Sequence, residues 1–169
     1  MSELFSLKGK TAVVTGSTRG IGLMIAEALV KAGVKTYISG RSQQMCEDVV
    51  EQLSAYGQCV AVSGDLSTEE GVLALGHKIK QQENALDILI NNASIHAVTP
   101  IAEAKFSDFT QLMNTNVASL FVLTQQLLPL LKINANRENP SRIINMGSSI
   151  VLENAHWDSY AYAASKAAI

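Results

Sequence analysis

The sequence has little that would mark a secreted, metal-binding or nucleic-acid-binding protein. Its two cysteines, Cys46 and Cys59, form no CxxC pair, which favours reduced and buried thiols over a disulfide framework. Its 13 basic and 15 acidic residues nearly balance, so it lacks the basic excess typical of proteins that bind nucleic acid or anionic membranes. Its histidines, His77, His96 and His156, are widely separated. No metal site is therefore expected.

Long apolar runs are also lacking. No run approaches the length of a membrane span, and the N-terminus carries no secretory leader. No repeat, low-complexity segment or linker interrupts the 169 residues, which suffice for one hydrophobic core but not comfortably for two. We therefore expect a soluble, cytoplasmic, single-domain protein without nucleic-acid or membrane partners.

The sequence does contain a regular alternation of short apolar runs and longer helical patterns. Periodicity predicts strands over residues 11–15, 35–39, 59–63, 86–91 and 142–146, and helices around 21–29, 45–53, 69–82, 107–131 and from 159 onward. Strands joined in this way by crossover helices build a parallel sheet covered on both faces. The predicted fold is therefore α/β, a doubly wound Rossmann-like sheet, with the fifth strand as an open apolar edge.

A glycine-rich turn joins the first predicted strand to the first helix. It reads Thr15, Gly16, Ser17, Thr18, Arg19, Gly20, Ile21, Gly22. Glycines let the backbone turn sharply and approach a ligand closely, and the N–H groups of the following helix favour a diphosphate. Such a turn is often no more than a tight turn, but its place between a strand and a helix predicts a nucleotide site.

The end of the second predicted strand distinguishes NAD from NADP. NAD-binding domains usually hold the ribose 2′-hydroxyl with a carboxylate about 20 residues after the glycine loop. The corresponding stretch here, Gly40-Arg41-Ser42, has no acid. Arg41 and Arg19 offer planar sets of donors to a 2′-phosphate, so the predicted cofactor is NADP(H). The alternative is that both are solvated surface arginines.

Several short motifs follow one another along the whole chain. After the glycine loop come Asp65-Leu66, Asn91-Asn92-Ala93, Asn116, Asn145-Met-Gly-Ser148 and Tyr162-x-x-x-Lys166. In this order they resemble the motifs of the short-chain dehydrogenase/reductase family. One departure is Ser94, which stands where the family's NNAG motif has glycine and adds a Cβ where the backbone faces the cofactor.

The resemblance implies roles for these residues. Those implied in NADP(H) binding are Gly16, Ser17, Arg19, Gly20, Ile21, Gly22, Arg41, Asp65, Leu66, Asn92, Ala93, Tyr162 and Lys166, with Asp65 against the adenine. Those implied in catalysis are Asn116, Ser148, Tyr162 and Lys166.

Tyr162 and Lys166 stand four residues apart and so share one face of the last predicted helix. A phenol ordinarily has a pKa near 10, and a neighbouring ammonium favours its ionised form. The resemblance implies that Tyr162 protonates a carbonyl oxygen as hydride arrives from the nicotinamide, and that Lys166 holds the nicotinamide ribose. It also implies that Asn116 anchors a water linking Lys166 to solvent. Tyr160 lacks a lysine at the same spacing.

Two adjacent serines compete for the substrate oxygen. Ser149 stands 13 residues before Tyr162, the spacing usual in the family. Counting from Asn145 at the end of the fifth strand selects Ser148 instead. We favour Ser148, because strand geometry fixes direction while loop length is free.

Within the family, four stretches resemble NADPH-dependent β-ketoacyl reductases of the rhamnolipid-pathway type: residues 53–57, 125–131, 138–142 and 160–168. The resemblance implies an oxidoreductase that transfers hydride between NADP(H) and a small carbonyl or alcohol substrate, preferably a 3-oxoacyl thioester. Family members are longer and assemble as homo-oligomers. Residues 1–169 are therefore expected to form one NADP(H)-binding domain, incomplete after the start of the last helix. The alternative is a non-catalytic NADP(H)-binding module.

Overall fold

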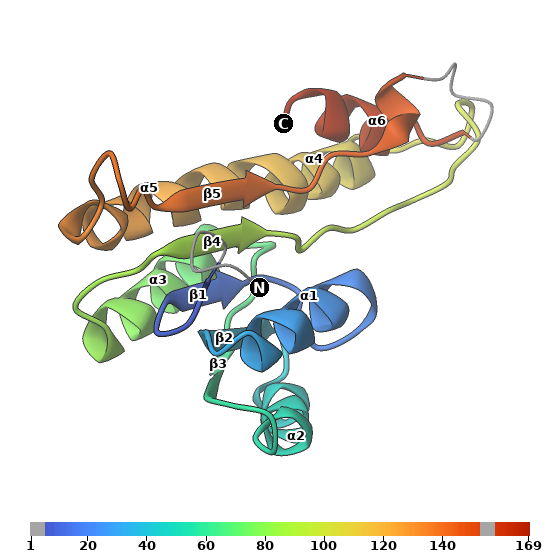
Figure 1. The fold of residues 1–169 in the computed structure, drawn as a ribbon. Coiled ribbons are helices and arrows are strands. Elements are labelled where there is room, and N and C mark those ends of the chain that lie inside the picture. Colours follow the sequence, from blue (N-terminus) through green and yellow to red (C-terminus); the bar gives the residue numbers. More distant parts are fainter. Residues whose placement is uncertain (1–5, 153–157) are drawn as a thin grey trace.

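A five-stranded parallel sheet forms the centre of the molecule in the computed structural model, which describes residues 6–152 and 158–169 (Figure 1). Its strands are β1 (Thr11–Val14), β2 (Lys35–Gly40), β3 (Cys59–Ser63), β4 (Ile88–Asn91) and β5 (Arg142–Asn145). The strand order is β3-β2-β1-β4-β5, and every pairing is parallel. Strand order reverses between β1 and β4, where open α/β sheets bind ligands beyond the carboxyl ends of the strands. The predicted doubly wound fold is confirmed.

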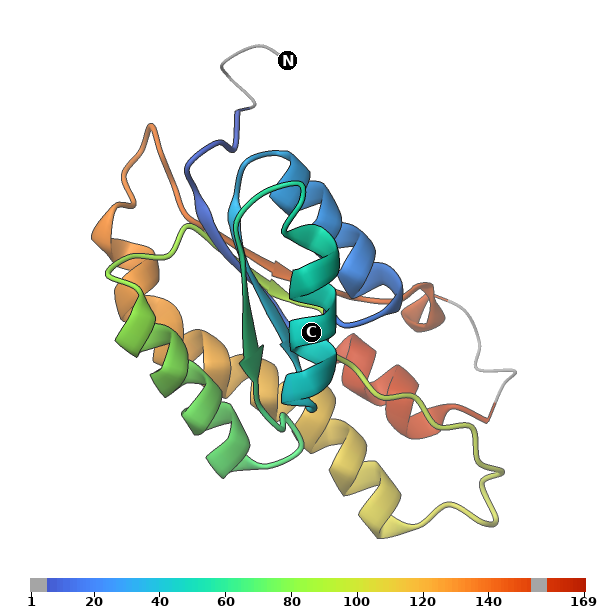
Figure 2. The same ribbon diagram turned by 90° about the horizontal axis from the view of Figure 1, so that it is seen from below.

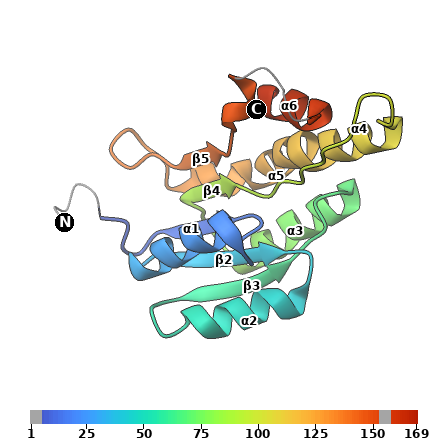
Figure 3. The same cartoon turned by 90° about the vertical axis from the view of Figure 1, so that its right-hand side faces the viewer.

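Helices cover both faces of the sheet. They are α1 (Gly20–Lys31), α2 (Gln43–Leu53), α3 (Glu69–Gln82), α4 (Phe106–Met113), α5 (Ser119–Ile133) and α6 (Tyr160–Ala167). The pair α1 and α2 lies on one face, and α3 and α5 lie on the other (Figures 2 and 3). α6 packs beside α4, near the carboxyl ends of β4 and β5 (Figure 1).

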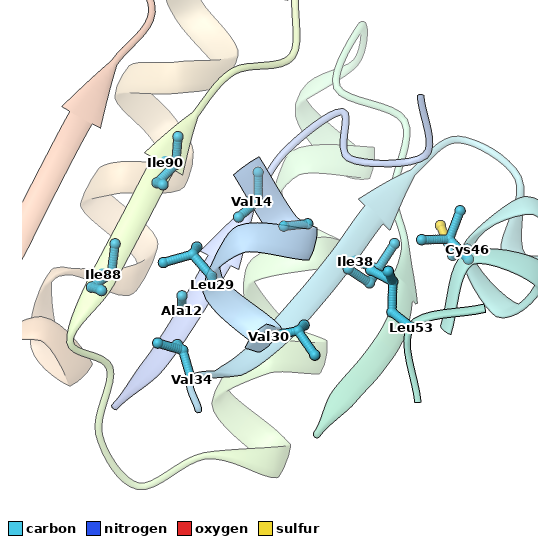
Figure 4. Packing of buried hydrophobic residues seen from close by; sticks show 12 residues of the cluster. Ala12, Val14, Leu29, Val30, Val34, Ile38, Cys46, Leu53, Ile88 and Ile90 are labelled. Atoms are coloured by element: carbon cyan, nitrogen blue, oxygen red, sulfur yellow. The ribbon is translucent and has the colours of Figure 1, made fainter. Parts of the chain in front are cut away.

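Alternate residues of β1 to β4 point into two separate cores. Ala12 and Val14 of β1 face α1 and α2, together with Ile38 and Ile90 (Figure 4). Val13, between them, faces α3 and α5. Full burial of a Val, Leu or Ile side chain contributes roughly 1.5–3 kcal/mol. The two cores therefore fix β1 and β4, and with them the crevice between their ends.

The long helix predicted around residues 107–131 is present, as one helical run over Phe106–Ile133. A π-helical turn, η2 (Asn114–Ala118), lies within it, between α4 and α5. This turn buries the side chains of Thr115 and Asn116. Such insertions widen a helix locally and are frequent at functional sites.

Taken together, these helical segments span Phe106–Ile133, a run of 28 residues long and apolar enough, by composition alone, to cross a membrane. Core helices of soluble proteins share this length and composition. Leu112, Leu123 and Leu127 of this run are buried in the protein interior. Other large apolar side chains of this run are exposed, among them Phe106, Phe121 and Ile133.

The expected open edge at the fifth strand is present. β5 lies at one end of the strand order, and its Ile143 and Ile144 are 43% and 45% exposed. The polar segment before it, residues 134–140, contains no regular element.

Candidate active site

The glycine loop has no room for side chains at two of its positions. Gly16 adopts φ +64°, and a Cβ there would lie 2.9 Å from the Cα of Ala93. A Cβ on Gly22 would lie 2.2 Å from the carbonyl oxygen of Gly16. Because these contacts fall far below van der Waals distance, both positions require glycine if the loop is to keep its shape.

Asn92 and Ala93 support this loop from behind. The Thr15 hydroxyl accepts hydrogen bonds from the backbone N–H groups of Asn92 and Ala93, each at 3.0 Å. The Asn92 amide donates to the carbonyl oxygens of Thr15 at 2.8 Å and Gly16 at 3.2 Å. The end of β4 and the glycine loop are therefore one hydrogen-bonded unit.

Ser17 also ties the loop to its surroundings. Its side chain is fully buried, donating to the Val14 carbonyl at 2.7 Å and accepting from the Ser39 N–H at 2.8 Å. Its own N–H donates to the Ser39 carbonyl at 2.9 Å. Ser17 therefore anchors the loop to β2, and its contact with the cofactor stays a prediction.

The amino end of α1 differs from those of α2 and α3. Ser42 and Thr68 cap α2 and α3 by accepting from the N–H groups of Met45 and Gly71. Arg19, at the corresponding position of α1, makes no side-chain cap. Arg19, Gly20 and Ile21 are exposed. The first N–H groups of α1 therefore have no side-chain acceptor at the cap position, which suits a diphosphate.

The carboxyl ends of β2 and β3 carry opposite charges. Arg41 and Asp65 are both exposed. Hydrogen bonds from the Ser67 N–H and hydroxyl lower the pKa of Asp65, and the field of Arg41 adds to this effect. The cofactor candidate Leu66, next to Asp65, is 9% exposed.

Sequence reasoning did not single out Thr18. A Cβ built on Gly40, the last residue of β2, would lie 2.8 Å from Cγ2 and 3.3 Å from Oγ1 of Thr18, so the Thr18 side chain lies against the residue that precedes Arg41. The parallel register that pairs Val14 with Ile38 brings the two segments together. The loop sequence alone does not show whether Ser17 or Thr18 points inward.

Asn116 joins three separated parts of the chain. Its Oδ1 accepts from the Ile95 N–H at 2.9 Å, and its Nδ2 donates to the Ile95 carbonyl at 3.0 Å and to the Ser165 hydroxyl at 2.9 Å. Both amide hydrogens are thus used. Any water at Asn116 must therefore donate to Oδ1 or to a backbone carbonyl.

Tyr162 and Lys166 lie together on α6, as predicted. The Lys166 ammonium is 5.8 Å from the centre of the Tyr162 ring and donates to the Met146 carbonyl, after β5, at 2.6 Å. Lys166 is only 6% exposed, and burial lowers its pKa. No acidic partner of Lys166 occurs among the ion pairs of residues 6–152 and 158–169. The site therefore holds a buried positive charge close to a phenol.

The two candidate serines differ in exposure. Ser148 is half-buried and caps a short 3-10 helix, η3 (Ser149–Val151), by accepting from the Ile150 N–H at 3.4 Å. Ser149 is exposed. The choice of Ser148 remains a prediction.

Metal ligands are not gathered at this site. In the described part of the chain, no group of three His, Cys, Asp or Glu side chains is placed to hold an ion. His156 lies outside the described residues. The two cysteines are free, and burial raises the pKa of both thiols.

A glycine loop at the point where strand order reverses, together with a Tyr-Lys pair on α6, is typical of nucleotide-dependent oxidoreductases of the Rossmann type. The short chain dehydrogenase family profile matches residues 10–169, and the chain belongs to this family. The family predicted from the motifs is confirmed.

Individual members of the family are similar to this chain over most of its length. The chain is 43% identical, over its whole length, to the rhamnolipids biosynthesis 3-oxoacyl-[acyl-carrier-protein] reductase of Pseudomonas aeruginosa, of which it covers 66%. It superposes on the Pseudomonas aeruginosa RhlG/NADP active-site complex with a TM-score of 0.95 and 43% identity, covering 99% of this chain and 66% of that one. The NADP-bound 3-oxoacyl (acyl-carrier-protein) reductase of Agrobacterium tumefaciens C58 gives 0.87 and 30% identity, with 98% and 62% covered. The chain thus spans about two thirds of the length of these relatives.

Proposed function

We propose that residues 1–169 form the NADP(H)-binding and catalytic domain of an oxidoreductase that reduces a ketone to an alcohol. The observation that carries the proposal is the buried Lys166 ammonium beside the Tyr162 ring, near the carboxyl end of β5. The non-catalytic alternative is not favoured, because the chain belongs to the short chain dehydrogenase family and Tyr162 and Lys166 lie together on α6.

The residues at the crevice fit a phosphorylated dinucleotide. The diphosphate would lie against the glycine loop and the uncapped start of α1, and the 2′-phosphate against Arg41, Arg19 and Thr18. No acid follows β2 to repel that phosphate. NADPH, when bound, supplies the hydride that reaches the carbonyl carbon. The NADP complexes of the two structural relatives support this choice.

Tyr162 supplies the proton. As the carbonyl oxygen gains charge, the phenol donates its hydrogen to it, and Lys166 stabilises the phenolate that remains. The field of Lys166 is effective because the ammonium is buried, where solvent screens it poorly. Ser148 donates a second hydrogen bond to the same oxygen.

Asn116 positions this machinery. It binds both backbone groups of Ile95 and the Ser165 hydroxyl, and the Ser165 hydroxyl donates to the Tyr162 carbonyl at 2.8 Å. The π-turn η2 therefore sets the distance between the loop after β4 and the turn of α6 that carries Tyr162.

A 3-oxoacyl thioester is the proposed substrate, since two of the relatives bear the name of 3-oxoacyl-acyl-carrier-protein reductase. The protein is proposed to be cytoplasmic. It is also proposed to be a homo-oligomer, because α4 and α5 expose large apolar side chains, among them Phe106, Phe121 and Ile133. Burial of such side chains between copies would remove them from water.

Cofactor binding and turnover test the proposal separately. The 169-residue chain is titrated with NADPH and NADH by cofactor fluorescence. NADPH oxidation is then followed with a 3-oxoacyl thioester in the full-length protein that carries residues 1–169. We expect tight NADPH binding and ketone-dependent oxidation. Binding without turnover in the full-length protein would leave only a nucleotide-binding module.

Arg41→Asp is expected to raise the Kd of NADPH about 100-fold and to leave NADH binding equal or tighter. A hydrogen bond to a charged group contributes about 1.5–3 kcal/mol, and the new carboxylate repels the 2′-phosphate but suits a 2′-hydroxyl. The matched control is Arg137→Asp, in the loop before β5 at the opposite edge of the sheet. We expect this variant to leave the Kd values of NADPH and NADH unchanged. Equal loss of NADPH and NADH affinity in Arg41→Asp would contradict the proposal that Arg41 binds the 2′-phosphate.

The serine pair is resolved by single alanine variants of the full-length protein. Ser148→Ala is expected to lower kcat about 100-fold, the usual effect of deleting one hydrogen bond to a developing oxyanion. Ser149→Ala is expected to stay within about twofold of the parent. The reverse pattern in steady-state kinetics would transfer the role to Ser149.

A further inference from the structure

One side chain outside the predicted catalytic set contacts the ring of Tyr162. His96 lies in the segment after β4, and its ring meets the Tyr162 ring edge-on, with centroids 4.5 Å apart and planes at 76°. This is a favoured geometry for an aromatic pair, because the positive edge of one ring meets the negative face of the other.

The same histidine is itself held in place. Its Nε2 lies 3.0 Å from the hydroxyl of Ser159, the residue that precedes α6. Three residues further on, the Thr99 N–H donates to the Asp158 carbonyl at 2.9 Å. The segment after β4 is therefore fastened at two points to the residues that begin α6, and His96 reaches from it to Tyr162.

The exposure of His96 argues against a role of its side chain in core packing. His96 is exposed, so its ring contributes little to either hydrophobic core. Its hydrogen bond and its ring contact both go to the start of α6, where the proposed proton donor lies. Lys166 contacts the same phenol ring from within α6, with its ammonium 5.8 Å from the ring centre.

We infer that His96 is a positioning residue for Tyr162: its ring restrains the phenol so that the hydroxyl faces the substrate carbonyl. The inference rests on the proposed function, because it takes Tyr162 to be the proton donor. Asn116 acts on the backbone of Tyr162 indirectly, because it donates to the Ser165 hydroxyl, which donates to the Tyr162 carbonyl. His96 contacts the Tyr162 ring directly. Asn116 and His96 therefore restrain the backbone and the side chain of Tyr162, respectively.

Three variants of the full-length protein that carries residues 1–169 separate the ring from the hydrogen bond. His96→Ala removes both contacts, His96→Gln keeps a polar group without the ring, and His96→Phe keeps the ring without the hydrogen bond. We expect kcat to fall about tenfold in His96→Ala and His96→Gln, with the Kd of NADPH unchanged. His96→Phe is expected to restore kcat to within about twofold of the parent.

The isotope effect reports whether chemistry is affected. With NADPH deuterated at the transferred position, His96→Ala should show a larger isotope effect on kcat than the parent, because proton and hydride transfer become slower. A merely structural role would lower the melting temperature and leave kcat of the folded enzyme and the isotope effect unchanged. That result, or rescue by Gln and not by Phe, overturns the inference.

The Tyr162→Phe variant separates a failure of this inference from a failure of the proposed function. If His96 acts through the phenol, His96→Ala should cost no further activity in the Tyr162→Phe background, since the pair then couples fully in a double-mutant cycle. An independent tenfold loss there contradicts the inference. Full activity of Tyr162→Phe contradicts the proposed function instead, whereas an inactive Tyr162→Phe with a normal His96→Ala contradicts the inference alone.

Discussion

Tyr162→Phe is expected to lower kcat of carbonyl reduction about 1,000-fold in the full-length protein that carries residues 1–169. Proton transfer by a positioned side chain contributes about 10²- to 10⁴-fold, and phenylalanine has no proton to give. The ring itself remains, so its contact with His96 at 4.5 Å and the helical backbone of α6 are retained. The Kd of NADPH should change no more than a few-fold, since the glycine loop and Arg41 are untouched.

Tyr160→Phe is the matched control, because the same hydroxyl is removed two residues earlier on the same helix. The Tyr160 hydroxyl donates to the Asp158 carboxylate at 2.9 Å, and Tyr160 is partly exposed. We expect kcat within about twofold of the parent, because an exposed hydrogen bond of this kind contributes little. Steady-state kinetics with saturating NADPH measure both variants. Similar losses in the two would mean that α6 needs phenols for its structure rather than Tyr162 for its chemistry.

The sheet could be predicted because the signal for each strand lies in a few consecutive residues. Each strand is a short run of apolar residues, so periodicity alone places β1 to β5 within a residue or two of their observed bounds. The glycine spacing between Gly16 and Gly22 likewise signals the loop. The positions of Tyr162 and Lys166 on one helix face follow from their separation in sequence.

The π-turn at Asn116 was not predictable from periodicity. Its side chain is turned inward by hydrogen bonds to Ile95 and Ser165, which stand 21 and 49 residues away. These partners meet only after the sheet has formed. The apolar pattern on either side of Asn116 is continuous, so it gives no sign of the extra residue in the turn.

The sequence also does not show which side chains of the loop point into the protein and which point outward. Ser17 and Thr18 are both small hydroxyl residues beside Arg19, yet Ser17 is fully buried under the loop while Thr18 packs on Gly40. The difference arises from the pairing of Ser17 with the backbone of Ser39, a tertiary contact. The sequence gives His96 no role for the same reason, since the contact between His96 and Tyr162 depends on how α6 packs.

Gly22→Ala is expected to cost about 3 kcal/mol of folding free energy and to abolish measurable NADPH binding by the 169-residue chain. The added Cβ would lie 2.2 Å from the Gly16 carbonyl oxygen and 2.5 Å from the Asn92 amide nitrogen. Overpacking of this kind costs typically about 1–3 kcal/mol, and here one of the atoms is backbone that cannot rotate away. The loop must shift, so the Asn92 hydrogen bonds to Thr15 and Gly16 and the first N–H groups of α1 lose their alignment.

Gly9→Ala is the control, because it adds the same methyl group where nothing lies within 4 Å, at a backbone φ of +81°. Its cost is that of the left-handed conformation alone, about 1 kcal/mol, and NADPH affinity should be unchanged. Urea denaturation and NADPH fluorescence titration measure both quantities. If Gly22→Ala bound NADPH as the parent does, the diphosphate would not lie against this turn, since the loop cannot keep its present shape with a side chain at that position.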